Sequence, residues 1–178
     1  MRCRILFTDS GVITVQKHFG GDRSFDRTWS EFKVGFGAVT DINYWIGNDR
    51  LHELTKYGQY KLRVELQTSD SRWIWAEYST FRVDSEGNGY RLMVGGYSGT
   101  AGDAFIHSDH NLNGAMFSTK DHDNDSLNNG NCAQLTQGGF WFKHCGYVRI
   151  NGVSGVNLGF VWLQTRLSEA RALLIRVH

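Results

Sequence analysis

Proline is absent from the 178 residues of this chain, and no long apolar run is present. Without proline, turns must be formed by Gly, Asn and Asp, and the sequence contains 21 glycines. The longest apolar runs, such as residues 172–175, are far shorter than the roughly 20 residues that a helix needs to cross a bilayer. Residues 1–7 also lack the apolar stretch of about 7 to 15 residues found in a secretory signal. We therefore expect neither a membrane span nor a signal peptide in this sequence.

A strong charge of either sign is also missing, since the formal net charge is +1 at pH 7 and the charged residues are scattered. Surfaces that bind nucleic acids or acidic membranes use clustered basic residues, so both partner classes are disfavoured. The hydrophobic content of 40% and the charged content of 21% are typical of a globular protein. The length favours one domain with a single core.

Cysteine is scarce, and its odd number, three, favours one disulfide pair with one cysteine left over. Cys132 and Cys145 are flanked by turn formers and aromatic residues. A bridge between them would contribute about 3 kcal/mol to stability in the chain-entropy model. Three buried thiols are the alternative. Metal ligation by cysteine is less favoured, because the sequence has no C-x-x-C pair.

A strand and a short helix are predicted near the start of the chain. Residues 12–19 have a strand pattern. Residues 26–32 predict a helix, because Thr28 and Glu31 have the spacing of a capping box and aromatic residues recur at helical spacing.

A second helix is predicted over residues 47–56. Asn48 or Asp49 can cap its N-terminus, and Leu51 and Leu54 give it an apolar face.

Three successive strands are predicted over residues 62–66, 73–83 and 90–94, with a Gly/Asn-rich turn at residues 84–89 between the last two. This pattern indicates an antiparallel meander. Four aromatic residues of the middle strand are expected to pack in the core and across strands: Trp73, Trp75, Tyr78 and Phe81.

The composition changes at residues 95–159, which are rich in Gly, Asn, Asp and Ser and have little periodicity. Aromatic residues interrupt this polar stretch and argue for packing rather than disorder. A long irregular region inside a compact domain is usually functional. The chain then closes with two strand-like segments, residues 160–163 and 172–177.

An acidic loop begins at Asp121 and runs to Cys132. The EF-hand pattern requires Gly at the sixth position and Glu at the twelfth, but Ser126 and Cys132 stand there. What remains is an Asp-x-Asp pair, Asp123 and Asp125, followed by a tight turn. Carboxylate and carbonyl oxygens are the ligands that calcium prefers, and a solvated Asx-rich turn is an equal alternative on spacing alone.

Several ordered motifs closely resemble the C-terminal fibrinogen-related domain, the globular module of fibrinogen chains, ficolins, tachylectins, angiopoietins and tenascins. The resemblance spans nearly the whole chain. It rests on residues 25–29, 35–37, 44–47, 76–78, 90–92, 95–104, 117–121, 123–125, 131–133, 140–145 and 151–152.

The resemblance implies a calcium site and a disulfide. The family's calcium ligands fall on the side chains of Asp123 and Asp125 and on the carbonyls of Leu127 and Asn129. This chain holds one more residue than the usual pattern between Asp125 and Cys132. Cys132 and Cys145 match the family's disulfide, and the His144–Cys145 peptide bond is implied to be cis. Cys3 matches a cysteine whose partner lies upstream, in an N-terminal subdomain that is largely truncated here.

The resemblance also implies a pocket beside the calcium loop, which accepts acetyl groups in the lectin-like members. Its predicted residues are Phe142, His144, Cys145, Gly146 and Tyr147. The sequence departs from the family at three positions, where Thr136, Phe140 and Gly146 replace an aromatic residue, a tryptophan and a histidine. Catalysis is not expected, because no nucleophile or paired acid accompanies His144.

We therefore expect an α+β domain over residues 1–178, with a twisted, mainly antiparallel central sheet, short flanking helices and a loop-rich calcium and pocket subdomain at about residues 95–159. The resemblance implies a secreted, Ca²⁺-dependent lectin that binds acetylated or microbial glycans in innate-immune pattern recognition. The alternative is a protein-binding module of the matrix, clotting or receptor-ligand type that uses the same pocket. Oligomerisation of the full-length protein would raise avidity.

Overall fold

An antiparallel sheet forms one layer of the domain, in a computed structural model that describes residues 11–108, 110–155 and 159–177. Its strand order is β2-β1-β11-β3-β4-β5, and β10 pairs with β11 outside this path. The strands are β1 (Val12–Phe19), β2 (Tyr44–Trp45), β3 (Tyr60–Thr68), β4 (Trp73–Val83), β5 (Leu92–Gly99), β10 (Val161–Trp162) and β11 (Thr165–Arg176).

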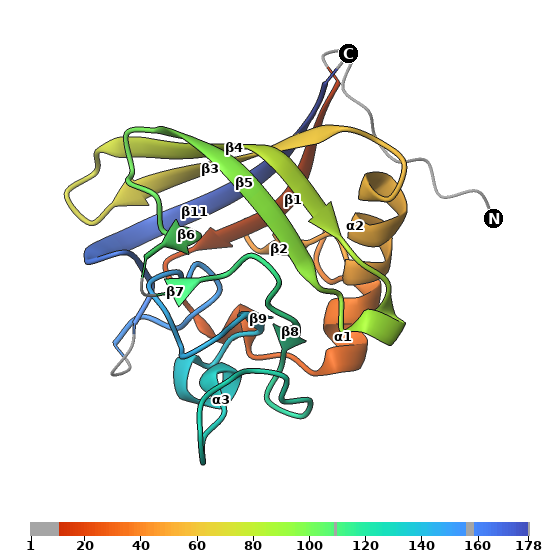
Figure 1. Cartoon of the computed structure of the whole chain (residues 1–178). Helices are drawn as coiled ribbons and strands as arrows, with labels where there is room; N and C mark the ends of the chain where they lie inside the picture. Colours follow the sequence, from red (N-terminus) through yellow and green to blue (C-terminus); the bar gives the residue numbers. More distant parts are fainter. Residues whose placement is uncertain (1–10, 109, 156–158, 178) are drawn as a thin grey trace.

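The last strand lies in the middle of the sheet, between the first strand and the third (Figure 1). β11 pairs antiparallel with β1 from Val12↔Ile175 to Phe19↔Glu169 and with β3 from Tyr60↔Arg176 to Thr68↔Leu167. The predicted segment 172–177 therefore captured only the second half of a 12-residue strand. This pairing joins the first and the last strands of the described residues.

The meander of β3, β4 and β5 is confirmed. In β3, burial alternates without a break, and Leu62, Val64 and Leu66 point into the core. Such a period of two is what a strand with one covered face requires.

The four aromatic residues of β4 do not share one environment. Tyr78 and Phe81 are buried, as predicted, but Trp73 is 48% exposed. Trp73 and Trp75 lie on the outer face of the sheet, under the guanidinium groups of Arg171 and Arg63 at 5.0 and 4.5 Å. The core prediction was therefore wrong for these two tryptophans, whereas their contacts with arginines of β3 and β11 confirm the predicted packing across strands.

A break in the β4–β5 pairing explains this difference. Ser79 has no partner in the register, and the glycine opposite it, Gly96, has φ +70°. Buried positions change from even numbers before the break, such as Tyr78, to odd numbers after it, such as Phe81 and Val83.

Helix α2 (Asn48–Thr55) packs against β4 of the sheet, and helix α1 (Trp29–Val34) packs against α2. Two short 3₁₀ turns are η1 (Arg23–Phe25) and η2 (Glu86–Asn88). The Thr28–Glu31 capping box of α1 is confirmed. The cap predicted for α2 was wrong, because Gly47 is the N-cap and makes no side-chain capping bond. Gly47 has φ +104°, and a Cβ there would meet the Val34 carbonyl oxygen at 2.7 Å. Only glycine fits this close approach.

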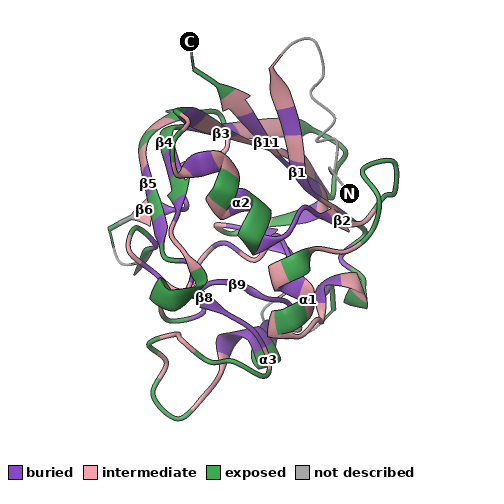
Figure 2. Cartoon of the chain, turned by 90° about the vertical axis from the view of Figure 1, so that its right-hand side faces the viewer, coloured by how far each residue is buried: buried purple, intermediate pink, exposed green. Residues whose placement is uncertain are grey.

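The other half of the domain is rich in loops and contains β6 (Ile106–His107), β7 (His110–Asn111), β8 (Phe117–Ser118), α3 (Cys132–Thr136) and β9 (Phe140–Trp141). β8 and β9, coloured as buried in Figure 2, belong to the same core cluster as the buried residues of the sheet. Two buried tryptophans hold backbone of the loops through their indole N–H groups. Trp141 donates to the Tyr90 carbonyl at 2.7 Å, and Trp162 donates to the Gly102 carbonyl at 3.0 Å.

Polar side chains of β1 anchor the segment that follows Tyr147. Gln16 Nε2 donates to Asn151 Oδ1 at 3.1 Å, and a ring nitrogen of the fully buried His18 lies 3.0 Å from the Ile150 carbonyl oxygen. The other ring nitrogen faces Asp22, at 3.3 Å from its carbonyl oxygen and 3.6 Å from its carboxylate. Burial disfavours the imidazolium more than these oxygens favour it, so the pKa of His18 is lowered.

This lowered pKa predicts a loss of stability in mild acid. The unfolded chain takes up a proton at His18 near pH 6.5, whereas the folded chain resists it until a lower pH. The free energy of unfolding should therefore fall as the pH drops below about 6.5. Urea titrations between pH 5 and 8 measure this slope, and His18→Gln should flatten it. An identical slope in His18→Gln and in the exposed control His144→Gln would contradict the assignment.

Candidate functional site

The acidic loop joins β8 to α3 and is held by its own carboxylates. Asp121 Oδ1 accepts the backbone N–H of Trp29 at 2.9 Å and the hydroxyl of Thr119 at 2.8 Å. Because Trp29 is the first residue of α1, Asp121 supplies negative charge to the N-terminus of that helix. Asp121 is thus engaged in joining the two halves of the domain.

Asp123 and Asp125 shape the next turn. Asp123 Oδ1 accepts the backbone N–H of Asp125 at 3.1 Å. Asp125 accepts the N–H of Leu127 on one oxygen and the N–H of Cys132 on the other, both at 2.7 Å. Partial burial and the negative charge of Asp123 raise the pKa of Asp125 despite these donors. The pair therefore concentrates negative charge that a cation would offset.

The fit of this loop to a cation depends on backbone oxygens. Within the described ranges, no group of three or more His, Cys, Asp or Glu side chains could hold a metal ion. The predicted calcium ligands include only two carboxylates, those of Asp123 and Asp125. The other two predicted ligands are the backbone carbonyls of Leu127 and Asn129. Asn129 has φ +58°, a conformation that Asn tolerates better than most residues and that turns the chain sharply here. Two carboxylates and nearby carbonyls are hard oxygen donors suited to Ca²⁺.

The disulfide between Cys132 and Cys145 is present, with a Cα–Cα distance of 4.9 Å. It joins the first residue of α3 to the turn that follows β9, and both cysteines are buried. The implied cis bond was wrong, because no described peptide bond is cis and His144–Cys145 is therefore trans. The chain turns here through positive φ angles, +52° at Cys145 and +29° at Gly146.

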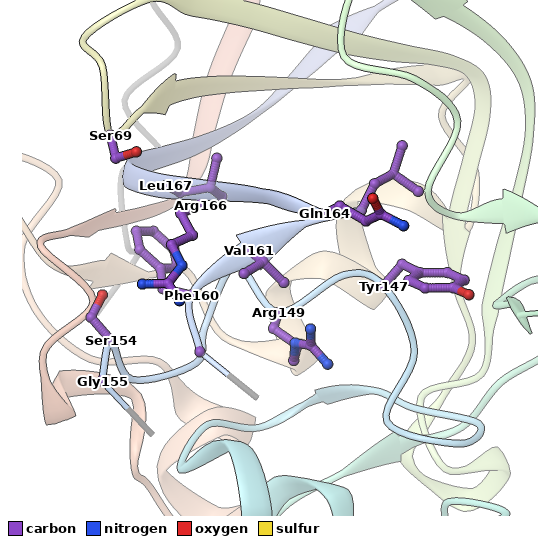
Figure 3. Close-up of a pocket in the computed structure, with 12 residues that line it drawn as sticks. Ser69, Tyr147, Arg149, Ser154, Gly155, Phe160, Val161, Gln164, Arg166 and Leu167 are labelled. Atoms are coloured by element: carbon purple, nitrogen blue, oxygen red, sulfur yellow. The ribbon is translucent and has the colours of Figure 1, made fainter. Parts of the chain in front are cut away.

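A groove of about 680 Å³ lies beside this turn, under the β10–β11 hairpin (Figure 3). Its floor is apolar and includes Phe160, Val161 and Leu167, which are 2%, 9% and 6% exposed. Polar groups complete the lining: Ser69, Tyr147, Arg149, Ser154, Gln164 and Arg166. A recess with an apolar floor and a polar rim is typical of a binding site.

Arg149 is the most constrained polar residue of the groove. Its Nη1 donates to the Gly146 carbonyl at 3.1 Å, and its buried Nε has no hydrogen-bond partner among the described residues. Burial lowers the pKa of the guanidinium, which nevertheless stays charged at neutral pH. The side chain therefore carries a positive charge with unused donor capacity to the groove.

The predicted pocket residues are divided between the core, the surface and the groove. Phe142 and Cys145 are buried at 3% and 7% exposure, and the ring of Phe142 packs 6.0 Å from that of Phe140. His144 is exposed. Tyr147 alone of the predicted set lines the groove. The acetyl pocket stays a prediction.

Arg149 and Arg166 are absent from that set. A signal for Arg149 was present in the alternation of residues 147–150, because Val148 and Ile150 are buried whereas Tyr147 and Arg149 are not. No comparable pattern distinguishes Arg166, since its place depends on the pairing of β10 with β11.

The sheet with an inserted last strand, the loop-rich half and the Cys132–Cys145 disulfide define a fibrinogen-like globular domain. The family model described as "Fibrinogen beta and gamma chains, C-terminal globular domain" matches residues 1–167, so the chain belongs to this family. The family consists of binding modules, and no catalytic family matches.

Similar curated proteins include the Drosophila melanogaster protein scabrous, 39% identical over 91% of this chain and 19% of that protein. Fibrinogen-like protein 1 of Bos taurus is 38% identical over 80% of this chain and 48% of its own length. Angiopoietin-4 of Bos taurus is 39% identical over 85% and 29%. The chain thus spans from about a fifth to about half of these relatives.

Solved structures agree with the fold. The fibrinogen-like globe domain of human ANGPTL6 has a TM-score of 0.84 at 33% identity, covering 94% of this chain and 78% of that one. Lamprey fibrin D-dimer, in complex with the peptide ligand Gly-His-Arg-Pro-amide, has a TM-score of 0.84 at 27% identity, covering 93% and 61%.

The hydrogen bonds of Asp125 predict that its carboxylate contributes to the stability of the fold even without bound metal. Asp125→Asn keeps one acceptor oxygen and leaves a backbone N–H, at Leu127 or Cys132, without its partner, so we expect a loss of about 1–3 kcal/mol. Asp123→Asn is the matched control, because its remaining oxygen can still accept the Asp125 N–H. Urea unfolding in EDTA measures both variants. Equal stability of Asp125→Asn and the parent would refute this role.

Proposed function

We propose that this domain is an extracellular protein-recognition module that receives a segment of a partner protein in the groove under the β10–β11 hairpin. The observation that carries the proposal is the groove itself, about 680 Å³, with an apolar floor and a polar rim. In the same fold, the lamprey fibrin D-dimer structure contains a peptide ligand. A peptide segment would place an apolar side chain on Val161 and polar groups along the rim.

An extracellular location is supported by the disulfide and by the relatives. Disulfides persist in oxidising compartments, and the Cys132–Cys145 bridge closes the loop that precedes the groove. Fibrinogen and tenascin, whose human members are 41% and 37% identical to this chain over the matched regions, are extracellular proteins. No helix in the described part of the chain is long and apolar enough to span a membrane.

Calcium is proposed as the ion that stabilises the acidic loop. Asp123 and Asp125 would supply carboxylates, and Leu127 and Asn129 would supply carbonyl oxygens. Bound Ca²⁺ supplies positive charge that offsets the repulsion within this pair. Because Asp125 also accepts the N–H of Cys132, the ion would stiffen the loop up to the disulfide and hence the turn that leads to Tyr147.

Carbohydrate recognition is the second candidate function. It rests on the family's lectin-like members and on an apolar recess large enough for an acetyl group. The turn at Cys145 and Gly146 differs from the implied pocket, because the bond is trans and no histidine stands after the second cysteine. The protein-binding function therefore fits this chain better.

Protein recognition and carbohydrate recognition predict different results when surface proteins or surface glycans are removed from cells. A labelled, tetramerised form of the domain is incubated with a panel of cultured animal cells, before and after surface proteolysis or enzymatic deglycosylation. We expect proteolysis to abolish binding and deglycosylation to leave it, with free N-acetylglucosamine as an inert competitor. EDTA and the Asp123→Asn/Asp125→Asn variant should both weaken binding, and calcium should raise the melting temperature of the parent alone.

The reverse pattern, with binding lost on deglycosylation and retained after proteolysis, would establish the lectin function instead. A melting temperature that responds to calcium equally in the parent and the double variant would remove Asp123 and Asp125 as ligands.

A further inference from the structure

The groove contains positive charge without matching negative charge. Its lining includes Arg149 and Arg166 but no Asp or Glu. Within the described residues, neither Arg149 nor Arg166 forms an ion pair with an acidic side chain. Asp70 follows the lining residue Ser69 in the chain, but its carboxylate already accepts hydrogen bonds from Arg72 Nε at 2.7 Å and from the hydroxyl of Thr68.

The two arginines lie in one row across three backbone segments. The N–H of Arg149 donates to the Val161 carbonyl at 3.0 Å, and Val148 bridges to Trp162. Val161 is in turn the cross-strand partner of Arg166. Residues opposite one another in antiparallel pairs project from the same face. Arg149, Val161 and Arg166 therefore share one face, and Figure 3 shows them on the same side of the hairpin.

The spacing of this row sets the size of the ligand. Adjacent strands are about 4.8 Å apart, so the Cα atoms of the two arginines are about 10 Å apart, with an apolar residue between them. An extended peptide advances about 3.3 Å per residue and its side chains alternate between two faces, so carboxylates four residues apart share one face, about 13 Å from each other, within reach of both guanidinium groups. Val161, which is 9% exposed, then faces the side chain midway between those carboxylates, because that side chain points to the same face as they do.

Arg149 is held in place by hydrogen bonds, which indicates a preorganised binding site rather than a mobile charge on the surface. Its Nη1 is held by the Gly146 carbonyl, its backbone is held by Val161, and its buried Nε has no protein acceptor in the described part of the chain. Arg166 is exposed, and its carbonyl accepts the N–H of Ser69 at 3.1 Å. A guanidinium fixed at its backbone and at one nitrogen loses little freedom when it binds a carboxylate with its remaining donors.

We propose that the groove recognises an acidic segment of a partner protein, in which two carboxylates flank an apolar side chain and pair with Arg149 and Arg166. This inference rests on the proposed protein-binding function and names the chemistry of the partner. Sulfated or carboxylated glycans offer the same negative charge, but the apolar Val161 between the two arginines matches an aliphatic side chain rather than a hydroxylated sugar ring.

A peptide titration followed by NMR tests the proposal. The probe is acetyl-Asp-Gly-Ile-Gly-Glu-amide, and its neutral control is acetyl-Asn-Gly-Ile-Gly-Gln-amide. The acidic peptide should shift the backbone amides of Val161 and Arg166 and the Nε–Hε signal of Arg149, whereas the neutral peptide should leave them unchanged. Arg166→Gln should weaken the acidic peptide about threefold to tenfold, as expected for an exposed charged hydrogen bond. Arg149→Lys, which keeps the charge, tests the forked geometry and should weaken it also.

Arg82→Gln is the matched control, because Arg82 is exposed on β4 outside the groove lining and its replacement changes the net charge equally. Affinity in Arg82→Gln should equal that of the parent. Equal binding of both peptides, an unchanged affinity in Arg166→Gln, or shifts confined to residues outside the groove would overturn the inference. Stronger groove shifts with N-acetylneuraminic acid or a sulfated disaccharide than with the acidic peptide would overturn the assignment to a protein segment.

The two proposals fail in distinguishable ways. If the acidic peptide leaves the groove signals unchanged while proteolysis of cells still abolishes binding, the acidic-segment inference alone is wrong. If cell binding survives proteolysis, the proposed function is wrong, and the partner class named here is wrong with it.

Discussion

The insertion of β11 between β1 and β3 is the constraint on which the rest of the structure depends. This strand pairs along nearly its whole length on both sides, so the end of the chain completes the core that its beginning starts. Because most of these contacts join residues far apart in sequence, their formation carries a large loop-closure entropy. The sheet cannot be complete until the last strand is in place.

The same strand positions the groove. The first residues of β11, Thr165 and Arg166, pair with β10 across the turn at residues 163–164, and β10 contacts residues 148–149. Arg166 on one strand and Arg149 on the adjoining segment are therefore placed by a sheet whose centre is β11. On the other side of residues 147–151, Gln16 and His18 of β1 hold Ile150 and Asn151 through buried hydrogen bonds. The groove is thus fixed by β1 and β11, two neighbouring strands of the sheet.

Local patterns predicted the elements well and the placement of their faces less well. The strand at residues 12–19, the capping box of Thr28 and Glu31, and the limits of β4 followed from periodicity and side-chain chemistry. Trp73 and Trp75 were misplaced because the buried face of β4 changes at Ser79, where the pairing with β5 is interrupted. A single strand does not record such an interruption, since it depends on Gly96 of the neighbour. The central position of β11 is likewise a property of pairing and not of its own residues.

The candidate site shows the same division. The Cys132–Cys145 bridge and the carboxylate turn could be predicted from residue type and family resemblance, whereas the trans bond at Cys145 and the paired placement of Arg149 and Arg166 required the fold. Hydrogen–deuterium exchange with mass spectrometry tests the central claim most directly, because it reports which backbone bonds open only with the whole domain. We predict that the peptide covering residues 165–176 exchanges more slowly than any other, through global unfolding alone. Faster exchange there than in β3 and β4 would contradict the claim that this strand completes the core and fixes the groove.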